Sequence, residues 1–112
     1  MDKDKIIKSE TRKLNKIKEL IPEEKKAIAT NLIKELAFMT ATLEELKAFI
    51  GDNGAVEVFE QGSQKFNRES PALKSYTALI NRYSSLYKQL TSLIPESLEQ
   101  EKSELLDFIE NE

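Results

Sequence analysis

The chain has no cysteine, no histidine and no tryptophan, and only three glycines and three prolines among its 112 residues. Without cysteine it forms no disulfide and no thiolate nucleophile, and without both cysteine and histidine it lacks the usual zinc ligands. The missing histidine also removes the commonest general base. No apolar run approaches the roughly 18 residues of a membrane span, and the first residues, MDKDKIIKSETRKLNK, lack an apolar signal core. We therefore expect a cytoplasmic protein without a membrane contact.

Charge is unevenly distributed along the chain, although the net charge is only −3. Residues 1–20 carry a net +3 and residues 61–90 a net +4, whereas residues 21–60 carry −4 and residues 91–112 carry −6. Charge that is segregated in this way produces a field that attracts charged partners. The alternative is that each block is simply the solvated face of a helix.

The spacing of apolar residues predicts a mostly helical protein, because they recur in steps of three and four. Pro22 separates the first two helices and Pro95 ends the third. We expect residues 1–95 to form one helical domain. The predicted order is a basic helix within 1–21 (about Lys3 to Leu20), a long helix over 23–50, a connecting segment over 51–70, a long helix over 71–94 and an acidic tail over 96–112.

The connecting segment alternates in polarity around a central glycine, as in AVEVFEQGSQKF. This pattern predicts a short β-hairpin, with an irregular loop as the alternative. Because two strands alone are marginal in water, a hairpin here is expected to pack on the helices or on a neighbouring subunit. Gly51 is the expected cap of the preceding helix. Ser70 and Pro71 predict a sharp helix start, since serine accepts a hydrogen bond from a free N–H and proline has none to lose.

The third helix carries the strongest periodic signal in the chain. Its apolar residues recur in alternating steps of four and three, which is the heptad spacing of helices that pack together. A row of tyrosines can also stack nucleic-acid bases, but heptad spacing favours a core or a subunit interface. We therefore predict an all-α fold with a long antiparallel helical hairpin and the connecting segment inserted in it. The predicted core or oligomer face consists of Tyr76, Ile80, Tyr83, Leu86, Tyr87 and Leu90.

Two clusters of basic residues are candidate DNA contacts. Lysine and arginine bind phosphates through charge and counterion release, which needs no fixed motif. The first cluster shares one face of the N-terminal helix, and the second surrounds the start of the third helix. The alternative is that both clusters only keep the surface solvated. The candidate residues are Lys5, Lys8, Arg12 and Lys16 in the first cluster and Lys65, Arg68, Lys74 and Arg82 in the second.

The sequence does not support catalysis. Its carboxylates fall on predicted water-facing helix surfaces, and no glycine loop has the spacing of a phosphate-binding motif. We expect no enzymatic activity, no cofactor and no metal site. The acidic tail has a weak apolar stripe, which is typical of an amphipathic helix that becomes ordered on a partner. Its candidate partner-binding residues are Leu98, Leu105, Phe108 and Ile109.

More than half of the chain, from about Leu32 to Pro95, follows one pattern of punctuation: LIKELAFMTATLEELKAFIGDNGAVEVFEQGSQKFNRESPALKSYTALINRYSSLYKQLTSLIP. A long helix ends at a glycine, a short stretch centred on G-x-Q follows, and S-P-A starts a last long helix that ends in L-x-x-L-x-P. The positions that carry the pattern are Gly54, Gly62, Gln64, Ser70, Pro71, Ala72, Tyr76, Leu90 and Pro95. In this pattern the chain resembles a class of bacteriophage terminase small subunits.

The resemblance implies a role in DNA packaging in the cytoplasm of a bacterial host. Small terminases recognise concatemeric phage DNA, assemble into rings and regulate a large subunit that holds the ATPase and nuclease. By this resemblance, the basic region would meet double-stranded DNA, the heptad helices would build a homo-oligomer and the acidic tail would dock the large subunit. The chain departs from the family in lacking a recognisable helix-turn-helix before residue 22, which argues against sequence-specific reading. The alternative is a phage or prophage adaptor or inhibitor that engages a host protein without binding nucleic acid.

Overall fold

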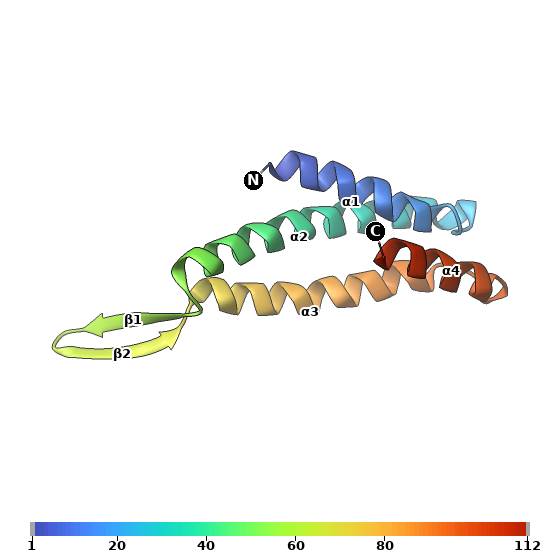
Figure 1. The fold of residues 1–112 in the computed structure, drawn as a ribbon. Helices are drawn as coiled ribbons and strands as arrows, with labels where there is room; N and C mark the ends of the chain where they lie inside the picture. Colours follow the sequence, from blue (N-terminus) through green and yellow to red (C-terminus); the bar gives the residue numbers. More distant parts are fainter. Residues whose placement is uncertain (1, 112) are drawn as a thin grey trace.

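Residues 2–111, which the computed structural model describes, form a mostly helical chain with one small antiparallel sheet, and the prediction of a mostly-α protein is confirmed. The molecule is elongated, 63 × 26 × 25 Å, with two long helices side by side and the sheet projecting from one end (Figure 1). In chain order the elements are α1 (Lys3–Lys18), α2 (Lys26–Asn53), β1 (Val56–Gln61), β2 (Gln64–Glu69), α3 (Pro71–Ser92) and α4 (Glu99–Glu110), with 3₁₀ turns at Glu23–Lys25 and Glu96–Leu98.

Helix α1 is closed at both ends by local hydrogen bonds. The Asp2 carboxylate accepts a hydrogen bond from the backbone N–H of Lys5 at 3.2 Å, which satisfies a free donor at the helix start. The helix ends at Lys18, two residues before the expected end, because the N–H of Leu20 turns back to the carbonyl of Ile17 at 3.0 Å. Ile21, which precedes Pro22, is buried in the core and anchors this turn.

Helix α2 begins and ends three residues later than the sequence suggested, and a different glycine ends it. The helix continues through Gly51 to Asn53, so the expectation that Gly51 caps it is wrong. Gly54 has a φ of +85°, a conformation that favours glycine, and its N–H donates to the carbonyl of Ile50 at 2.7 Å. Gly51 has open space where a side chain would begin and is an ordinary helical residue.

Residues 56–69 form a two-stranded antiparallel ribbon and not an irregular loop. Gly62, with a φ of +62°, and Ser63, whose φ is not positive, make the two-residue turn, which matches the type II′ hairpin pattern. Phe59 and Phe66 pair across the strands with their ring centres 5.2 Å apart. The ribbon projects beyond α2 and α3 (Figure 1), and β2 is exposed along its whole length, so most of the ribbon surface is uncovered.

Helix α3 begins where the sequence predicted. The hydroxyl of Ser70 accepts a hydrogen bond from the N–H of Ala72 at 3.2 Å, and Pro71 occupies the first helical position. Ser70 is buried, and its own N–H donates to the carbonyl of Ala55 at 2.8 Å, which closes the base of the ribbon. The helix ends at Ser92, two residues before the expected end.

The hydrophobic core lies at the end of the molecule that is remote from the ribbon, and all four helices contribute to it. Helices α1 and α3 each pack along α2, and α4 folds back to contact α1. Buried alanines on α2 at positions 29, 37 and 41 leave room for this close packing. The large buried side chains of the core are Leu14 and Ile17 from α1, Ile33 and Leu36 from α2, Leu90 and Ile94 from the end of α3 and the turn after it, and Ile109 from α4.

Candidate nucleic-acid interface

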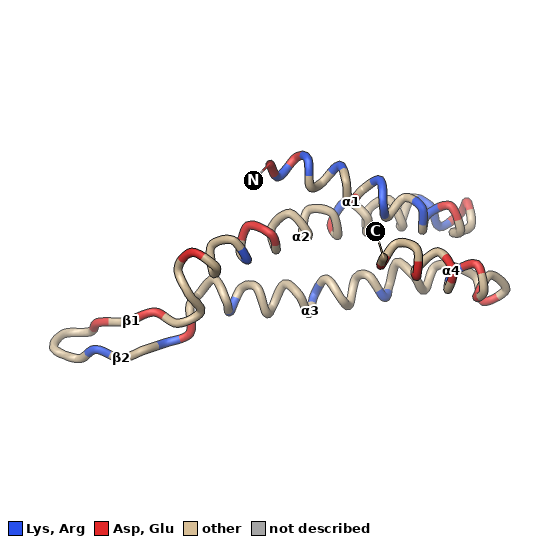
Figure 2. The backbone as a smooth tube through the Cα atoms, viewed as in Figure 1, with Lys and Arg blue, Asp and Glu red and all other residues tan. Residues whose placement is uncertain are grey.

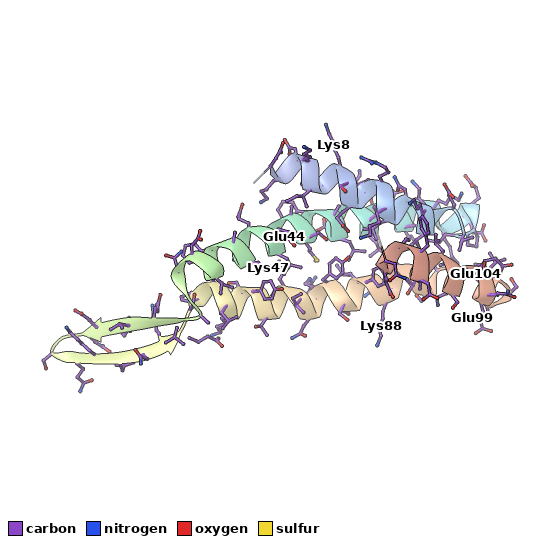
Figure 3. All side chains as sticks on the ribbon, viewed as in Figure 1. Lys8, Glu44, Lys47, Lys88, Glu99 and Glu104 are labelled. Atoms are coloured by element: carbon purple, nitrogen blue, oxygen red, sulfur yellow. The ribbon has the colours of Figure 1, made fainter. Side chains whose placement is uncertain are left out.

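The first predicted basic cluster forms a strip on the outer face of α1. Leu14 and Ile17, which are 1% and 0% exposed, hold the opposite face of the helix in the core. Residues three or four apart share a helix face, so the four cations line up on the side away from that core. Figure 3 shows the Lys8 side chain pointing away from the rest of the molecule. This surface, called the α1 strip below, consists of Lys5, Lys8, Arg12 and Lys16.

Three cations of the α1 strip are open to a ligand. Lys5, Lys8 and Arg12 are exposed, and within residues 2–111 no carboxylate lies within 4.0 Å of their charged groups. Lys16 differs, because its ammonium lies 4.7 Å from the centre of the Phe108 ring, which reaches it from α4. A groove of about 650 Å³ runs beside the open cations, between α1 and α2, and Asp2, Glu10 and Glu44 also line it. The three open cations, and not the groove, can hold phosphate oxygens by charge without base-specific contacts.

The second predicted cluster is spread over the ribbon and α3, and two of its four members are engaged inside the ribbon. Lys65 forms an ion pair with Glu60 at 3.5 Å. Arg68 pairs with Glu57 at 2.6 Å, and its guanidinium also lies 4.1 Å from the centre of the Phe59 ring. The other two members, Lys74 and Arg82, are exposed on α3.

The two basic clusters do not form one continuous surface within a single chain. Helices α1 and α3 each pack along α2 and have few contacts with each other. Figure 2 shows their basic residues on different sides of the helical body. The two basic clusters are therefore separate candidate sites.

The predicted core or oligomer face of α3 lies mostly against the core. Leu90 is fully buried, and Tyr83, Leu86 and Tyr87 pack against the core cluster, whereas Tyr76 is half-buried and Ile80 is 40% exposed. The Tyr83 and Tyr87 rings stack with their centres 6.1 Å apart. Burial, and then the negative charge of Glu10, raises the pKa of Tyr83. Burial, and then the neighbouring tyrosine, raises the pKa of Tyr87. These rings stabilise the fold and do not form an open platform for bases.

The apolar residues of the acidic tail occupy a different place from the one predicted. Ile109 is 4% exposed within the core cluster, and Leu98 and Leu105 pack against that cluster. The assignment of Ile109 to a partner-binding surface is therefore corrected, because this chain already covers it, whereas Leu98 and Leu105 are half-buried. Phe108 is 58% exposed and remains available. Helix α4 packs on α1, so Ile109 is covered without a partner protein.

The outer face of α4 is acidic. Glu99, Glu101, Glu104 and Asp107 are all exposed, and Figure 3 shows Glu99 and Glu104 on the surface of this helix. Within residues 2–111 no group of three or more potential ligand side chains is arranged to hold a metal ion. Among the same residues, no helix has the length and apolar character that crossing a bilayer requires.

Sequence reasoning missed two features of these surfaces. Lys88 belongs with Lys74 on the outer face of α3, and the signal was present, because residues 14 apart in a helix share a face. The contact of Phe108 with Lys16 joins residues 92 positions apart in the chain, and no local sequence pattern predicts it.

Comparisons with models of protein families, with curated proteins and with solved structures find no match to this chain.

Proposed function

We propose that the chain acts in phage DNA packaging as a non-catalytic protein of the terminase small-subunit type. In this role it contacts double-stranded DNA through the α1 strip, associates with further copies of itself and docks a large motor subunit. The observation that supports the proposal most strongly is the open part of the α1 strip. There, Lys5, Lys8 and Arg12 project from one helix face without a carboxylate partner within residues 2–111.

The open cations match the dimensions of a DNA backbone. Lys5 and Arg12 are seven residues apart in α1, which corresponds to about 10 Å along a helix at 1.5 Å per residue. One DNA strand places a phosphate about every 3.4 Å along the duplex axis, so the open cations span about three phosphates. Such contacts release condensed counterions and position the protein without reading sequence.

The acidic helix α4 is placed where it repels DNA only weakly from these cations. It reaches the α1 strip at Lys16, through Phe108. Lys5 is eleven residues away from Lys16, or about 16 Å along the helix. Charges are screened over about 8 Å at physiological salt, so the acids of α4 act mainly on the Lys16 end of the strip. DNA is therefore expected on the N-terminal half of α1.

The contact with the motor subunit is proposed for the outer face of α4. Exposed carboxylates on this face, with Phe108 as the one exposed aromatic residue at its edge, suit a basic surface that has a small apolar pocket. Because Ile109 belongs to the core, deleting residues 96–112 would damage the fold. The contact is better tested by replacing the exposed acids Glu101, Glu104 and Asp107 with their amides, which should weaken binding to a large terminase subunit and leave the free protein folded.

The DNA contact is tested by replacing Lys5, Lys8 and Arg12 together with glutamine. Binding to a short labelled duplex, followed by fluorescence anisotropy at low salt, should weaken by a similar factor on unrelated sequences, because phosphate contacts carry no sequence information. A control with Lys25, Lys34 and Lys47 replaced by glutamine removes the same charge elsewhere and should bind nearly as the parent does.

If neither the parent protein nor the control binds any duplex at low salt, the role in DNA packaging is refuted. An adaptor or inhibitor that acts on a host protein through α4 then becomes the better account.

A further inference from the structure

A crevice of about 250 Å³ opens where α1, α3 and α4 meet. Its most buried residues are apolar, namely Leu14 of α1 and Ile109 of α4, which are 1% and 4% exposed. The stacked rings of Tyr83 and Tyr87 from α3 also line it. Pockets for drug-sized ligands have volumes of about 300–1,000 Å³, so this crevice suits a single small chemical group.

The charged side chains at the crevice are two carboxylates and one ammonium, a net −1, and they belong to Glu10, Lys13 and Glu110. The ammonium of Lys13 lies 3.7 Å from the carboxylate of Glu10 and offsets its charge. Glu110, at the end of α4, is exposed, and within residues 2–111 no lysine or arginine nitrogen lies within 4.0 Å of its carboxylate. One negative charge beside the tyrosine rings is therefore left without an ion-pair partner in this part of the chain.

Both carboxylates are close enough to act on the rings. Burial contributes most to the raised pKa of Tyr87, and the neighbouring Tyr83, Glu110 and Glu10 raise it further. A potential that disfavours the negative charge of a phenolate favours a positive charge in the same place.

The tyrosine pair differs from the aromatic rings of this chain that already hold a cation. Phe38, Phe59 and Phe108 each have a lysine or arginine of the chain between 4.1 and 5.0 Å from the ring centre. Among residues 2–111, no lysine or arginine lies over the ring of Tyr83 or Tyr87 in this way. Because aromatic faces attract cations, a cation from outside the chain would satisfy both the rings and the carboxylate of Glu110.

We infer that the crevice binds a guanidinium group, carried either by an arginine side chain of a partner protein or by a free alkylguanidine. A guanidinium is planar, stacks on aromatic rings and can form two parallel hydrogen bonds to one carboxylate, here that of Glu110. It is also more weakly hydrated than an ammonium, so it loses less hydration on entering a partly apolar crevice. The inference does not rest on the proposed function, because no residue of the crevice belongs to the α1 strip.

Nuclear magnetic resonance of the full chain tests the site, with ethylguanidinium chloride as the probe. The chain has only three tyrosines, and the third, Tyr76, does not line the crevice and serves as an internal control. We expect the ring protons of Tyr83 and Tyr87 to shift in a saturable way, with a dissociation constant on the order of millimolar, and those of Tyr76 to stay unchanged. Ethylammonium chloride at the same concentrations controls for salt and charge and should bind at least about threefold more weakly.

Two single substitutions on α4 separate the crevice from general negative charge. Glu110→Gln removes the carboxylate without an ion-pair partner and should raise the dissociation constant about three- to fivefold, as the loss of one solvent-exposed ion pair does. Glu99→Gln removes the same charge from an exposed residue of the same helix that does not line the crevice (Figure 3), and it should leave the dissociation constant unchanged. Both side chains are exposed, so both variants should keep the helical content of the parent in circular dichroism.

The guanidinium site would be overturned by the absence of a saturable shift at Tyr83 and Tyr87, by equal binding of ethylammonium, or by equal weakening in the two variants. A blocked tripeptide with a central arginine, measured in the same way, distinguishes the two sources of the group. Binding of this peptide at least as tight as that of ethylguanidinium would assign the site to an arginine side chain. Binding of ethylguanidinium without binding of the peptide would assign it to a free alkylguanidine.

Discussion

Replacing Ile109 with alanine tests whether the acidic tail belongs to the folded body. The side chain is 4% exposed in a cluster with residues of α1, α2 and α3. The substitution removes three buried carbon atoms, which at about 0.8 kcal/mol each amounts to about 2.4 kcal/mol of lost transfer free energy. The cavity that remains raises the total only to about 3 kcal/mol, because α4 is short and can partly collapse onto it. The whole free energy of unfolding of a small domain is about 5–15 kcal/mol, so this loss is a large part of it.

The assay is urea unfolding of the free protein, followed by circular dichroism, with Phe108→Ala as the matched control. Phe108 is the larger residue, but it is 58% exposed, and its contact with Lys16 contributes only about 0.5–1 kcal/mol. Ile109→Ala should therefore destabilise the protein several times more than Phe108→Ala. If both variants unfold as the parent does, the tail is not packed in the free chain, and the account of α4 given above is wrong.

Three further predictions concern the helix ends and the tyrosines. Ser70→Ala should lower the free energy of unfolding by about 1 kcal/mol through loss of the α3 cap, and a loss of DNA binding at unchanged stability would contradict this structural role. Gly51→Ala should raise the free energy of unfolding by about 0.5–1 kcal/mol, and Gly54→Ala should lower it by a similar amount or more, because of these two glycines only Gly54 has a positive φ. If urea unfolding showed a change of the same sign for both variants, this placement of the helix end would be wrong. Because burial raises the pKa values of Tyr83 and Tyr87 above 10.0, the unfolded state loses these protons first, so the contribution of the two tyrosines to stability should be constant below about pH 10 and fall above it. Replacing both tyrosines with phenylalanine should flatten that fall in unfolding curves measured across this pH range.

Local signals in the sequence were sufficient for the helices and for the start of α3. Ser70 and Pro71 act on neighbouring backbone atoms, so the local sequence is enough to predict where that helix starts. The end of α2 was placed at the wrong glycine because Gly51 and Gly54 both suit a cap, and only the path of the chain into β1 selects the second. Alternating polarity predicted the ribbon, but the helices of this chain do not give it the support that we expected from them or from a neighbouring subunit, because β2 is exposed along its whole length.

Long-range packing was the part that periodicity could not supply. The stripe on the tail predicted an amphipathic helix, but the same stripe suits a partner protein or the chain's own core, and Ile109 lies in the core. Likewise, the spacing of the α1 strip placed four cations on one face without indicating that Phe108 covers the last of them. The number of open cations therefore comes from the folded structure, and it sets the size of the effect expected on DNA.

The dependence of DNA affinity on salt tests the central claim most directly. Each phosphate contact contributes about 0.9 to the slope of log affinity against log salt concentration on duplex DNA. Replacing Lys5, Lys8 and Arg12 with glutamine should therefore reduce the slope by about 2.7, and adding Lys16→Gln should change it little further, because that ammonium already faces Phe108. A slope that is unchanged in the triple variant, measured beside the Lys25, Lys34 and Lys47 control, would contradict the α1 strip as the DNA contact.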